Sequence, residues 1–323
     1  MDPSVDLLSQ LWPQLIWPLI RLLCFISIGL MVANIIESLN WTTKIAAVSR
    51  PLIRLGHLSQ RVGAAFSMAI VSGVAANTML AEAHDKQLIS KRELVLANLF
   101  NSLPTYFLHL PTIIVITLPL IKGAAFIYVG ITFAAALFRT AAIVVISRFI
   151  LPNPSEKTDV EIADQIKMNW SSVFQKAWRR FKKRMRKIAM FTVPIYIIIF
   201  VMNRYHFFSY LEEIVADHLS AIPWLSPQAM GIIVLHLAAE LTAGLAAAGA
   251  LLQEGVLSYR EIVLALLVGN VLSSPLRAVR HQFPYYAGIF KPRLAMELII
   301  YNQAFRIFSL IFAGFIYFAL TNV

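Results

Sequence analysis

Long apolar stretches, broken at a few places by charged residues and prolines, limit this chain to few folds. Of its 323 residues, 59% are apolar and only 14% are charged, against about 25% charged in soluble domains. A membrane-spanning helix needs about 20 apolar residues. We therefore expect an all-α polytopic membrane protein. The apolar stretches are residues 11–36, 62–80, 94–121, 124–150, 188–202, 230–252, 262–271 and 294–320.

Polar residues and prolines interrupt two of these stretches. Asn101, Ser102 and Pro104 split the stretch 94–121. Its later counterpart begins at residue 262 and is broken by Asn270, Ser273, Ser274 and Pro275. A broken helix at membrane depth persists only where protein or a water-filled cavity satisfies the freed backbone groups. The sequence therefore predicts a re-entrant helical hairpin at each interruption.

An internal repeat links the two interrupted segments. The octapeptide that begins at Ser90 is identical at six of eight positions to the one that begins at Ser258. Both contain Ser-x-Arg-Glu, which predicts a capping box at the start of a helix. We expect two repeats, residues 1–151 and 188–323, each with about three spanning helices and one re-entrant hairpin.

Loop charges predict the orientation of these repeats. The loop after the first stretch is basic, whereas its counterpart in the second half carries acidic residues, so the repeats should be inverted. Residues 152–187 link them and hold many of the lysines and arginines that give the chain its net charge of +11. We predict that 159–187 form a basic amphipathic helix on the cytoplasmic face of the plasma (inner) membrane, against anionic lipid.

Arginines inside apolar stretches are the most informative residues for function. Arg139 and Arg306 lie in matching stretches of the two repeats, and a central arginine costs about 2.5–3.5 kcal/mol even on lenient insertion scales. Guanidinium groups match carboxylate or phosphate, which predicts anion recognition. Pairing with hairpin carbonyls or with Glu297 or Glu240, or an interfacial position, would also explain them.

The interrupted segments supply further candidate ligands for a solute. Arg277 and Arg280 follow Pro275, where a hairpin turn would place them beside a helix N-terminus that attracts anions. Asn101, Ser102, Asn270, Ser273 and Ser274 could hydrogen-bond a bound solute. A shallow hairpin would instead leave the two arginines in cytoplasmic water.

His236 and Glu240 are the candidates for proton coupling. Their spacing of i, i+4 would place both side chains on one helical face. A structural contact or a counter-ion for an arginine would explain the pair equally well.

Several function classes have no support in the sequence. The single cysteine, Cys24, cannot form an internal disulfide or a multi-thiolate metal site. No Ser-His-Asp, HExxH, Walker or GxGxxG pattern occurs in a suitable context. We therefore expect no enzyme activity, no cofactor, no metal centre and no nucleic-acid partner.

The segment from Ser72 to Asn101 resembles the gate, or nucleoside-recognition, domain of ferrous iron permeases, spore maturation proteins and concentrative nucleoside transporters. Residues 241–280 resemble it more loosely. The resemblance implies two gate domains, at about 62–150 and 229–320, in a transporter-like membrane protein. Unlike the iron permeases, this chain has no cysteine in either segment.

These observations predict a transporter that moves a small anionic or nucleoside-like solute by alternating access, either as a homo-oligomer or with a second gate-type subunit. One alternative is a divalent metal permease with His109, His236, Glu240 and His281 as ligands. The other is a non-transporting membrane subunit that docks a partner. The intramembrane arginines count against a cation, because they raise the potential that it must cross.

Overall fold

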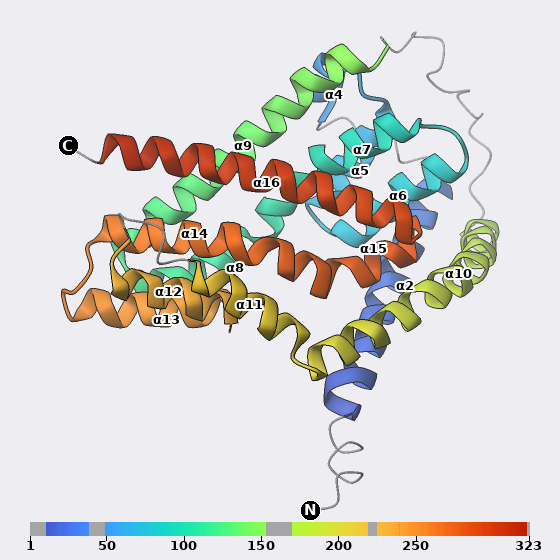
Figure 1. Cartoon of the computed structure of the whole chain (residues 1–323). Coiled ribbons are helices and arrows are strands. Elements are labelled where there is room, and N and C mark those ends of the chain that lie inside the picture. The colour runs from blue at the N-terminus through green and yellow to red at the C-terminus, as the bar shows by residue number, and fades with distance from the viewer. Residues whose placement is uncertain (1–10, 39–48, 153–169, 219–224, 239, 322–323) are drawn as a thin grey trace, which may run out of the picture. The chain divides into compact units, whose positions relative to one another are not determined.

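The computed structural model of the chain describes residues 11–38, 49–152, 170–218, 225–238 and 240–321 (Figure 1). Every element in these ranges is a helix. The helical runs that are long and apolar enough to cross a membrane are Lys91–Ile121, Gly123–Ile150, Tyr259–Phe290 and Pro292–Leu320. Their length and composition indicate a multi-pass membrane protein, as the sequence predicts.

Two compact units make up the structure. Unit 1 comprises Met1–Leu108, Thr140–Phe200 and Phe283–Ile299, and unit 2 comprises His109–Arg139, Val201–Gln282 and Ile300–Val323. Both halves of the sequence contribute to each unit. The units therefore differ from the two predicted repeats, which are continuous in sequence.

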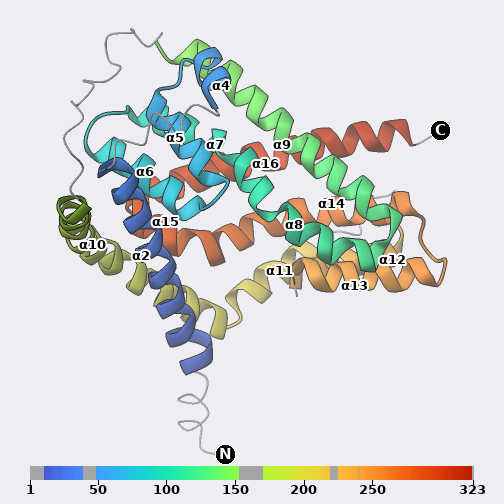
Figure 2. The ribbon, with the colours of Figure 1, turned by 180° about the vertical axis from the view of Figure 1, so that it is seen from behind.

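Unit 1 contains a pair of short antiparallel helices. Its first helices are η1 (Trp12–Ile16), α2 (Trp17–Ser38), α4 (Arg50–Leu55), α5 (Gln60–Ala69), α6 (Gly73–Asp85) and α7 (Lys91–Phe100). The turn at residues 70–72 brings α6 back against α5 (Figure 2). Ser72 caps α6 by accepting a hydrogen bond from the Ala75 amide at 3.2 Å.

The hairpin predicted within residues 94–121 is not found. α7 continues through Asn101 into α8 (Ser102–Ile121), because the Asn101 amide bonds to the Ala97 carbonyl at 3.1 Å and the Thr105 amide to the Asn101 carbonyl at 3.1 Å. Pro104 lies in the first turn of α8, where a missing amide proton is tolerated. The tight hairpin is instead the α5–α6 pair, which covers the whole of the apolar stretch 62–80 that was predicted to be a full span.

The same correction applies to the second half. α14 (Tyr259–Arg277) runs through Pro275 and continues as the π-helical segment η5 (Ala278–Gln282) into α15 (Phe283–Phe290). Pro275 removes one hydrogen bond but stays inside α14, and a π-helical turn follows it at residues 278–282. The prediction of a chain reversal near Pro275 is therefore wrong.

Unit 2 is built around a second pair of short helices, α12 (Pro227–Ala238) and α13 (Glu240–Gln253). α12 packs against both α13 and α14, as the yellow and orange ribbons of Figure 1 show. Fully buried aliphatic side chains fill the space between them; they include Ile232, Ile233, Leu245, Val263 and Leu266. This unit also includes the end of α8, the beginning of α9 (Gly123–Ile150), and α11 (Phe207–Asp217).

The repeated Ser-x-Arg-Glu motif caps a helix in both halves, but in two ways. Ser258 and Glu261 form the predicted capping box at the start of α14. Ser90 caps α7 through its hydroxyl, whereas the Glu93 carboxylate accepts a hydrogen bond at 3.0 Å from the Ser59 amide, which precedes α5. In the first copy the glutamate therefore joins two helices.

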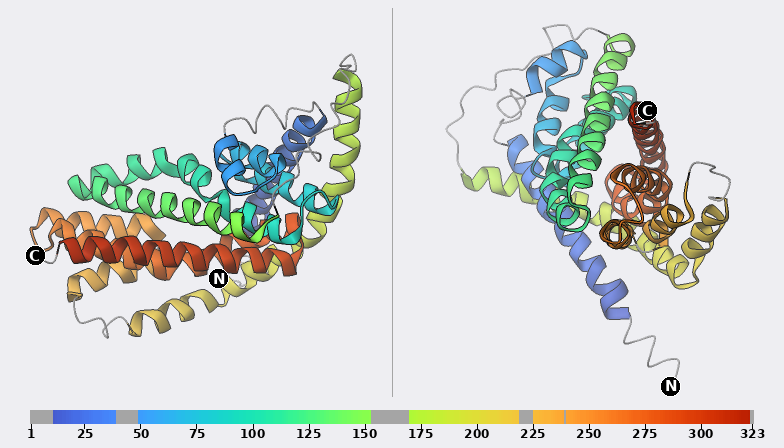
Figure 3. Two further views of the ribbon diagram at one scale, coloured as in Figure 1. Left: turned by 90° about the horizontal axis from the view of Figure 1, so that it is seen from above. Right: turned by 90° about the vertical axis from the view of Figure 1, so that its left-hand side faces the viewer.

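The predicted linker helix is part of a longer helix, α10 (Trp170–Arg204), which can be followed without a break in Figure 3. Residues 159–169 of the prediction lie outside the described residues. Phe174, Trp178 and Phe181 stack along α10 at centroid distances of 6.3 and 5.2 Å, and the Lys182 ammonium lies 5.5 Å from the Trp178 ring centroid. Aromatic rings beside cations suit a headgroup region.

Gly249 provides a test of the packing in unit 2. A Cβ atom at this position would lie 2.7 Å from the backbone carbonyl oxygen of Leu120, whereas one at Gly231 meets nothing within 4 Å. Gly249→Ala should therefore destabilise the protein by about 1–3 kcal/mol through overpacking. Gly231→Ala, the matched control, should be neutral or stabilising by up to about 1 kcal/mol. Melting curves of the purified variants measure both, and equal melting temperatures would contradict this packing.

Cysteine labelling tests the position of α10. In a Cys24→Ala background, Gln175→Cys should react with an impermeant maleimide in inside-out vesicles and not in right-side-out vesicles, because the basic half of α10 should face the cytoplasm. The side chain of Gln175 is exposed in the structure and can react. Cys24 is exposed as well, so it has to be replaced. Reaction only in right-side-out vesicles would refute the predicted topology.

Candidate functional site

Asn270 is the centre of a partly buried polar cluster in unit 2. Its side-chain amide nitrogen donates to the Tyr128 hydroxyl at 2.9 Å, and its amide oxygen accepts from Nη2 of Arg306 at 3.0 Å. Nη2 of Arg277 lies 3.5 Å from the same oxygen. Asn270 is 7% exposed. One neutral amide thus contacts two guanidinium groups, and we call these four residues the Asn270 cluster.

Three helices supply the cluster. Asn270 and Arg277 are separated by close to two helical turns on α14, so they share one face. Tyr128 comes from α9 and Arg306 from α16 (Pro292–Leu320). All four residues belong to unit 2 and lie within runs of membrane length.

Arg306 has no acidic counterpart among the described residues. Glu297, considered from sequence as a partner for an arginine, forms an ion pair at 2.7 Å with Lys91 in unit 1. Within the described part of the chain, no carboxylate forms an ion pair with Arg306 or Arg139. The explanation that pairs an intramembrane arginine with Glu297 is therefore wrong.

Two serines and a glutamine extend the polar surface next to the cluster. The Ser274 hydroxyl donates to the Gln303 side-chain oxygen at 2.5 Å, which ties α14 to α16. The Ser273 hydroxyl oxygen is buried and has no hydrogen-bond partner among the described residues. Ser273 therefore retains hydrogen-bonding capacity.

Arg139 lies near the cluster. The charges of Arg139 and Arg306 are within electrostatic range of each other, and Nε of Arg139 is buried without a hydrogen-bond partner in the described ranges. Arg306 lies slightly closer to the first residue of α16 than Arg139 lies to the first residue of α9. The offset corresponds to more than half a helical turn, so the predicted equivalence of these arginines is approximate.

His236 is enclosed by two glycines. It is fully buried on α12, and a Cβ atom on Gly269 would lie 2.6 Å from its Nδ1, while one on Gly244 would lie 2.8 Å from its Cβ. Both ring nitrogens lack hydrogen-bond partners among the described residues. The prediction that His236 and Glu240 share a helical face is wrong, because α12 ends at Ala238 and α13 begins at Glu240. The Glu240 side chain lies outside the described residues.

The other predicted site residues lie elsewhere. Asn101 and Ser102 are in unit 1, where both polar side-chain atoms of Asn101 are buried without a described partner and the Ser102 hydroxyl lies 3.4 Å from that of Thr140. Arg280 and His281 belong to η5, and His109 is exposed on α8. Of the predicted residues, the structure thus joins Asn270, Arg277 and Arg306 directly.

Sequence reasoning missed Tyr128 as a site residue. A tyrosine hydroxyl inside an apolar stretch needs a hydrogen-bond partner when it is buried, and Tyr128 is 2% exposed. That requirement was the available signal. It identifies Tyr128 as a polar position but does not show that Asn270 is its partner.

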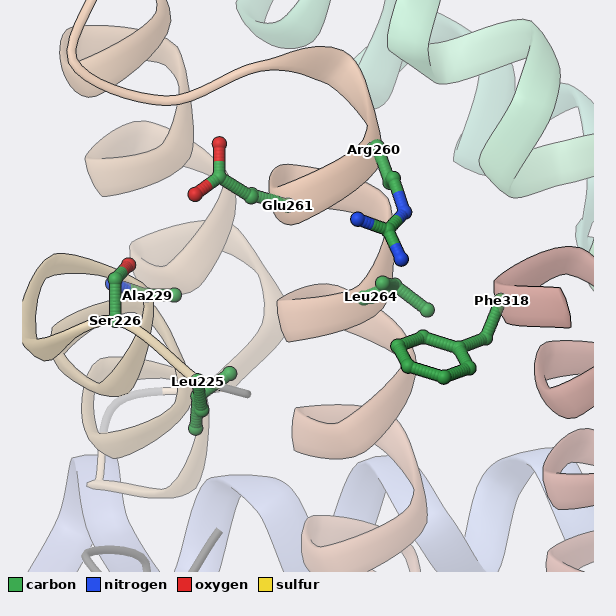
Figure 4. Close-up of a pocket in the computed structure, with 7 residues that line it drawn as sticks. All are labelled: Leu225, Ser226, Ala229, Arg260, Glu261, Leu264 and Phe318. Carbon is green, nitrogen blue, oxygen red and sulfur yellow. The ribbon is translucent and has the colours of Figure 1, made fainter. Parts of the chain in front are cut away.

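A small pocket at the start of α14 is separate from the cluster. Figure 4 shows Arg260 and Phe318 beside Leu264, with Ser226 and Leu225 across the hollow. Nε of Arg260 donates to the Thr321 hydroxyl at 3.0 Å and the guanidinium lies 5.1 Å from the Phe318 ring centroid. Glu261 belongs to the capping box. The charged groups here thus have structural roles.

Comparison with known proteins finds similar sequences in Methanocaldococcus jannaschii. One uncharacterised protein is 26% identical over 91% of this chain and 91% of its own length. A second is 27% identical over 87% of this chain and 88% of its own, and a third is 20% identical over 90% and 94%. No family model matches the chain. No solved structure matches it either.

Tyr128→Phe should destabilise the protein. The change leaves the buried Asn270 amide nitrogen without its acceptor, which costs about 1–3 kcal/mol, so the melting temperature should fall. Tyr301→Phe on α16 is the matched control, because Tyr301 is exposed and should tolerate the loss of its hydroxyl. Equal melting temperatures for the two variants would show that the Tyr128 hydrogen bond is not formed.

Proposed function

We propose that this protein is a membrane transporter that moves a small anionic solute by alternating access, and that the Asn270 cluster binds the solute. The observation that carries the proposal is the contact of Arg306 and Arg277 with one neutral amide oxygen. A nucleoside-like solute fits this site best if it carries a phosphate or carboxylate, because guanidinium groups select such anions.

Energetics favour an anion at this position. A guanidinium in a membrane-length helix loses hydration, and an amide oxygen returns only part of the lost interaction. A bound anion would supply the missing charge and form charge-assisted hydrogen bonds, which contribute about 1.5–3 kcal/mol each. Arg306 is half-buried and has a neutral amide as its described acceptor, which favours a binding role over a purely structural one.

The proposal of two gate repeats is supported by the spacing of helix boundaries. α7 begins at Lys91 and α9 at Gly123, and the interval between these starts is nearly the same as that between α14, at Tyr259, and α16, at Pro292. Both Lys122 and Lys291, which immediately precede α9 and α16, have positive φ, at 48° and 70°. These similarities of spacing and of backbone conformation support the proposal of a duplicated transporter unit.

The short helix pairs are the candidates for re-entrant hairpins. At about 1.5 Å per residue, the 12 residues of α12 and 14 of α13 extend about 18 and 21 Å, less than the roughly 30 Å hydrocarbon core. The α5–α6 pair is similarly short, with 10 and 13 residues. Each pair could enter the membrane and return to the same side, which is common where transporters bind solute.

His236 remains the candidate for proton coupling in this proposal. Its ring is buried in the same unit as the cluster and lies within electrostatic range of Arg277 and Arg306. A neutral imidazole whose nitrogens lack described partners can exchange a proton with water that enters during transport.

The metal-permease alternative has little support from the geometry. Across the described ranges, no group of three His, Cys, Asp or Glu side chains is placed to hold a metal ion. Two arginines on a shared oxygen also repel a cation. The docking-subunit alternative predicts no response to anions, so a measurement of anion binding distinguishes it from transport.

Arg306→Lys tests the proposed site. Lysine keeps the charge but loses the fork geometry of guanidinium, so binding of a stabilising anion should weaken about ten- to a hundredfold while the protein still folds. Arg293→Lys is the matched control, because Arg293 is exposed in the first turn of the same helix. The measurement is the shift in melting temperature of the full chain in nanodiscs with sodium acetate or inorganic phosphate, against sodium chloride at equal ionic strength.

Two outcomes would contradict the proposed function. If no anion stabilises the wild-type protein above the chloride control, the cluster binds no such solute and the docking alternative is preferred. If Arg306→Lys and Arg293→Lys retain equal affinity, anions bind elsewhere on the protein.

A further inference from the structure

We propose that Asn270 occupies the place of a solute carboxylate when the site is empty, and that the solute is a small carboxylate that takes Arg306 and Arg277 over from the amide oxygen. The inference rests on the proposed function and deepens it, since it names the substrate class and the step by which the solute enters.

The shared oxygen is the first observation behind the inference. Nη2 of Arg306 and Nη2 of Arg277 approach the same Asn270 oxygen, at 3.0 and 3.5 Å. Convergence of two guanidinium groups on one acceptor is the geometry that a carboxylate or phosphate oxygen attracts. Here a neutral amide oxygen contacts both arginines.

The hydrogen bond from Asn270 to Tyr128 fixes the orientation of the amide. The amide nitrogen donates to the Tyr128 hydroxyl at 2.9 Å, so the oxygen must point toward the arginines. Arginine is only a donor, which also requires an oxygen at that position. When the arginines turn from the Asn270 oxygen to an oxygen of the solute, the Asn270 nitrogen can keep its hydrogen bond to Tyr128. The amide therefore loses only its contacts with the arginines.

Planarity indicates the class of solute. A side-chain amide has nearly the same size and shape as a carboxylate, with one oxygen replaced by NH2 and the charge removed. A carboxylate can therefore present oxygens to Arg306 and Arg277 much as Asn270 does, with a negative charge added. The bond from guanidinium to the amide is already charge-assisted through its donor. A carboxylate adds a direct attraction between opposite charges, which favours the exchange. Phosphate offers similar oxygens in a tetrahedral arrangement and is the comparison ligand.

Neighbouring groups can receive the rest of the solute. The hydroxyl oxygen of Ser273 and Nε of Arg139 are both buried, and neither has a hydrogen-bond partner among the described residues. Both belong to unit 2. Buried polar atoms without partners are rare in folded proteins and require an explanation. A bound solute that carries a hydroxyl or a second acceptor would satisfy them.

Asn270→Asp is the decisive variant. It places a permanent carboxylate where the solute carboxylate is expected, at almost constant shape. The variant should be more heat-stable than the wild type without added anion, and its affinity for acetate should fall at least tenfold. Asn203→Asp is the control for added charge, because Asn203 is exposed near the end of α10, and it should respond to acetate like the wild type.

Asn270→Ser tests the same idea in the opposite direction, and also serves if Asn270→Asp fails to fold. Serine is too short to reach the arginines as the amide does, so it removes the internal competitor. Without anion this variant should melt at a lower temperature than the wild type. With acetate it should bind at least as tightly as the wild type and show the larger stabilisation.

The outcomes separate this inference from the proposed function. If acetate stabilises the wild type and Asn270→Asp equally, the inference is overturned while anion binding stands. If both Asn270 variants lose acetate binding, Asn270 is a direct ligand and does not give way to the solute. If phosphate stabilises the wild type and acetate does not, the carboxylate class is wrong. If no anion stabilises the wild type, the proposed function fails first.

Discussion

The constraint on which this account depends is a guanidinium group held within a membrane-length helix with only a neutral amide as its described acceptor. Arg306 donates to Asn270, and Arg277 reaches the same oxygen. In water the two positive charges would interact only weakly, because solvent and salt would screen them. Where screening is weaker, the two guanidinium groups favour the binding of an anion. The surrounding helices hold these donors in position for it.

Composition predicted the all-helical membrane class, because the length and apolar content of a stretch are local properties of a sequence. The location of the helical hairpins was not predictable from the same signals. Pro275 and Asn101 suggested chain reversals, but a π-helical turn and a near-helical asparagine carry the chain through. The chain reverses at residues 70–72 and again between α12 and α13, inside the apolar stretches 62–80 and 230–252, which contain no proline.

Part of the candidate site could be found from sequence for a similar reason. A charge in an apolar stretch is expensive wherever it occurs, so Arg306 and Arg139 were identified without a structure. Their partners depend on which helices meet, and that is a tertiary property. The structure pairs Glu297 with Lys91 rather than with an arginine, and it adds Tyr128 to the site. His236 and Glu240 fail as a single-helix pair for the same reason, since a helix end falls between them.

A ligand-bound experimental structure tests the central claim most directly. The full chain would be crystallised with 4-bromobenzoate, a planar carboxylate whose bromine gives an anomalous signal. The account predicts a carboxylate oxygen within about 3 Å of Nη2 of Arg306, with Asn270 released by that arginine and still bonded to Tyr128. Bromine signal elsewhere in the protein, with Arg306 still donating to Asn270, would contradict it.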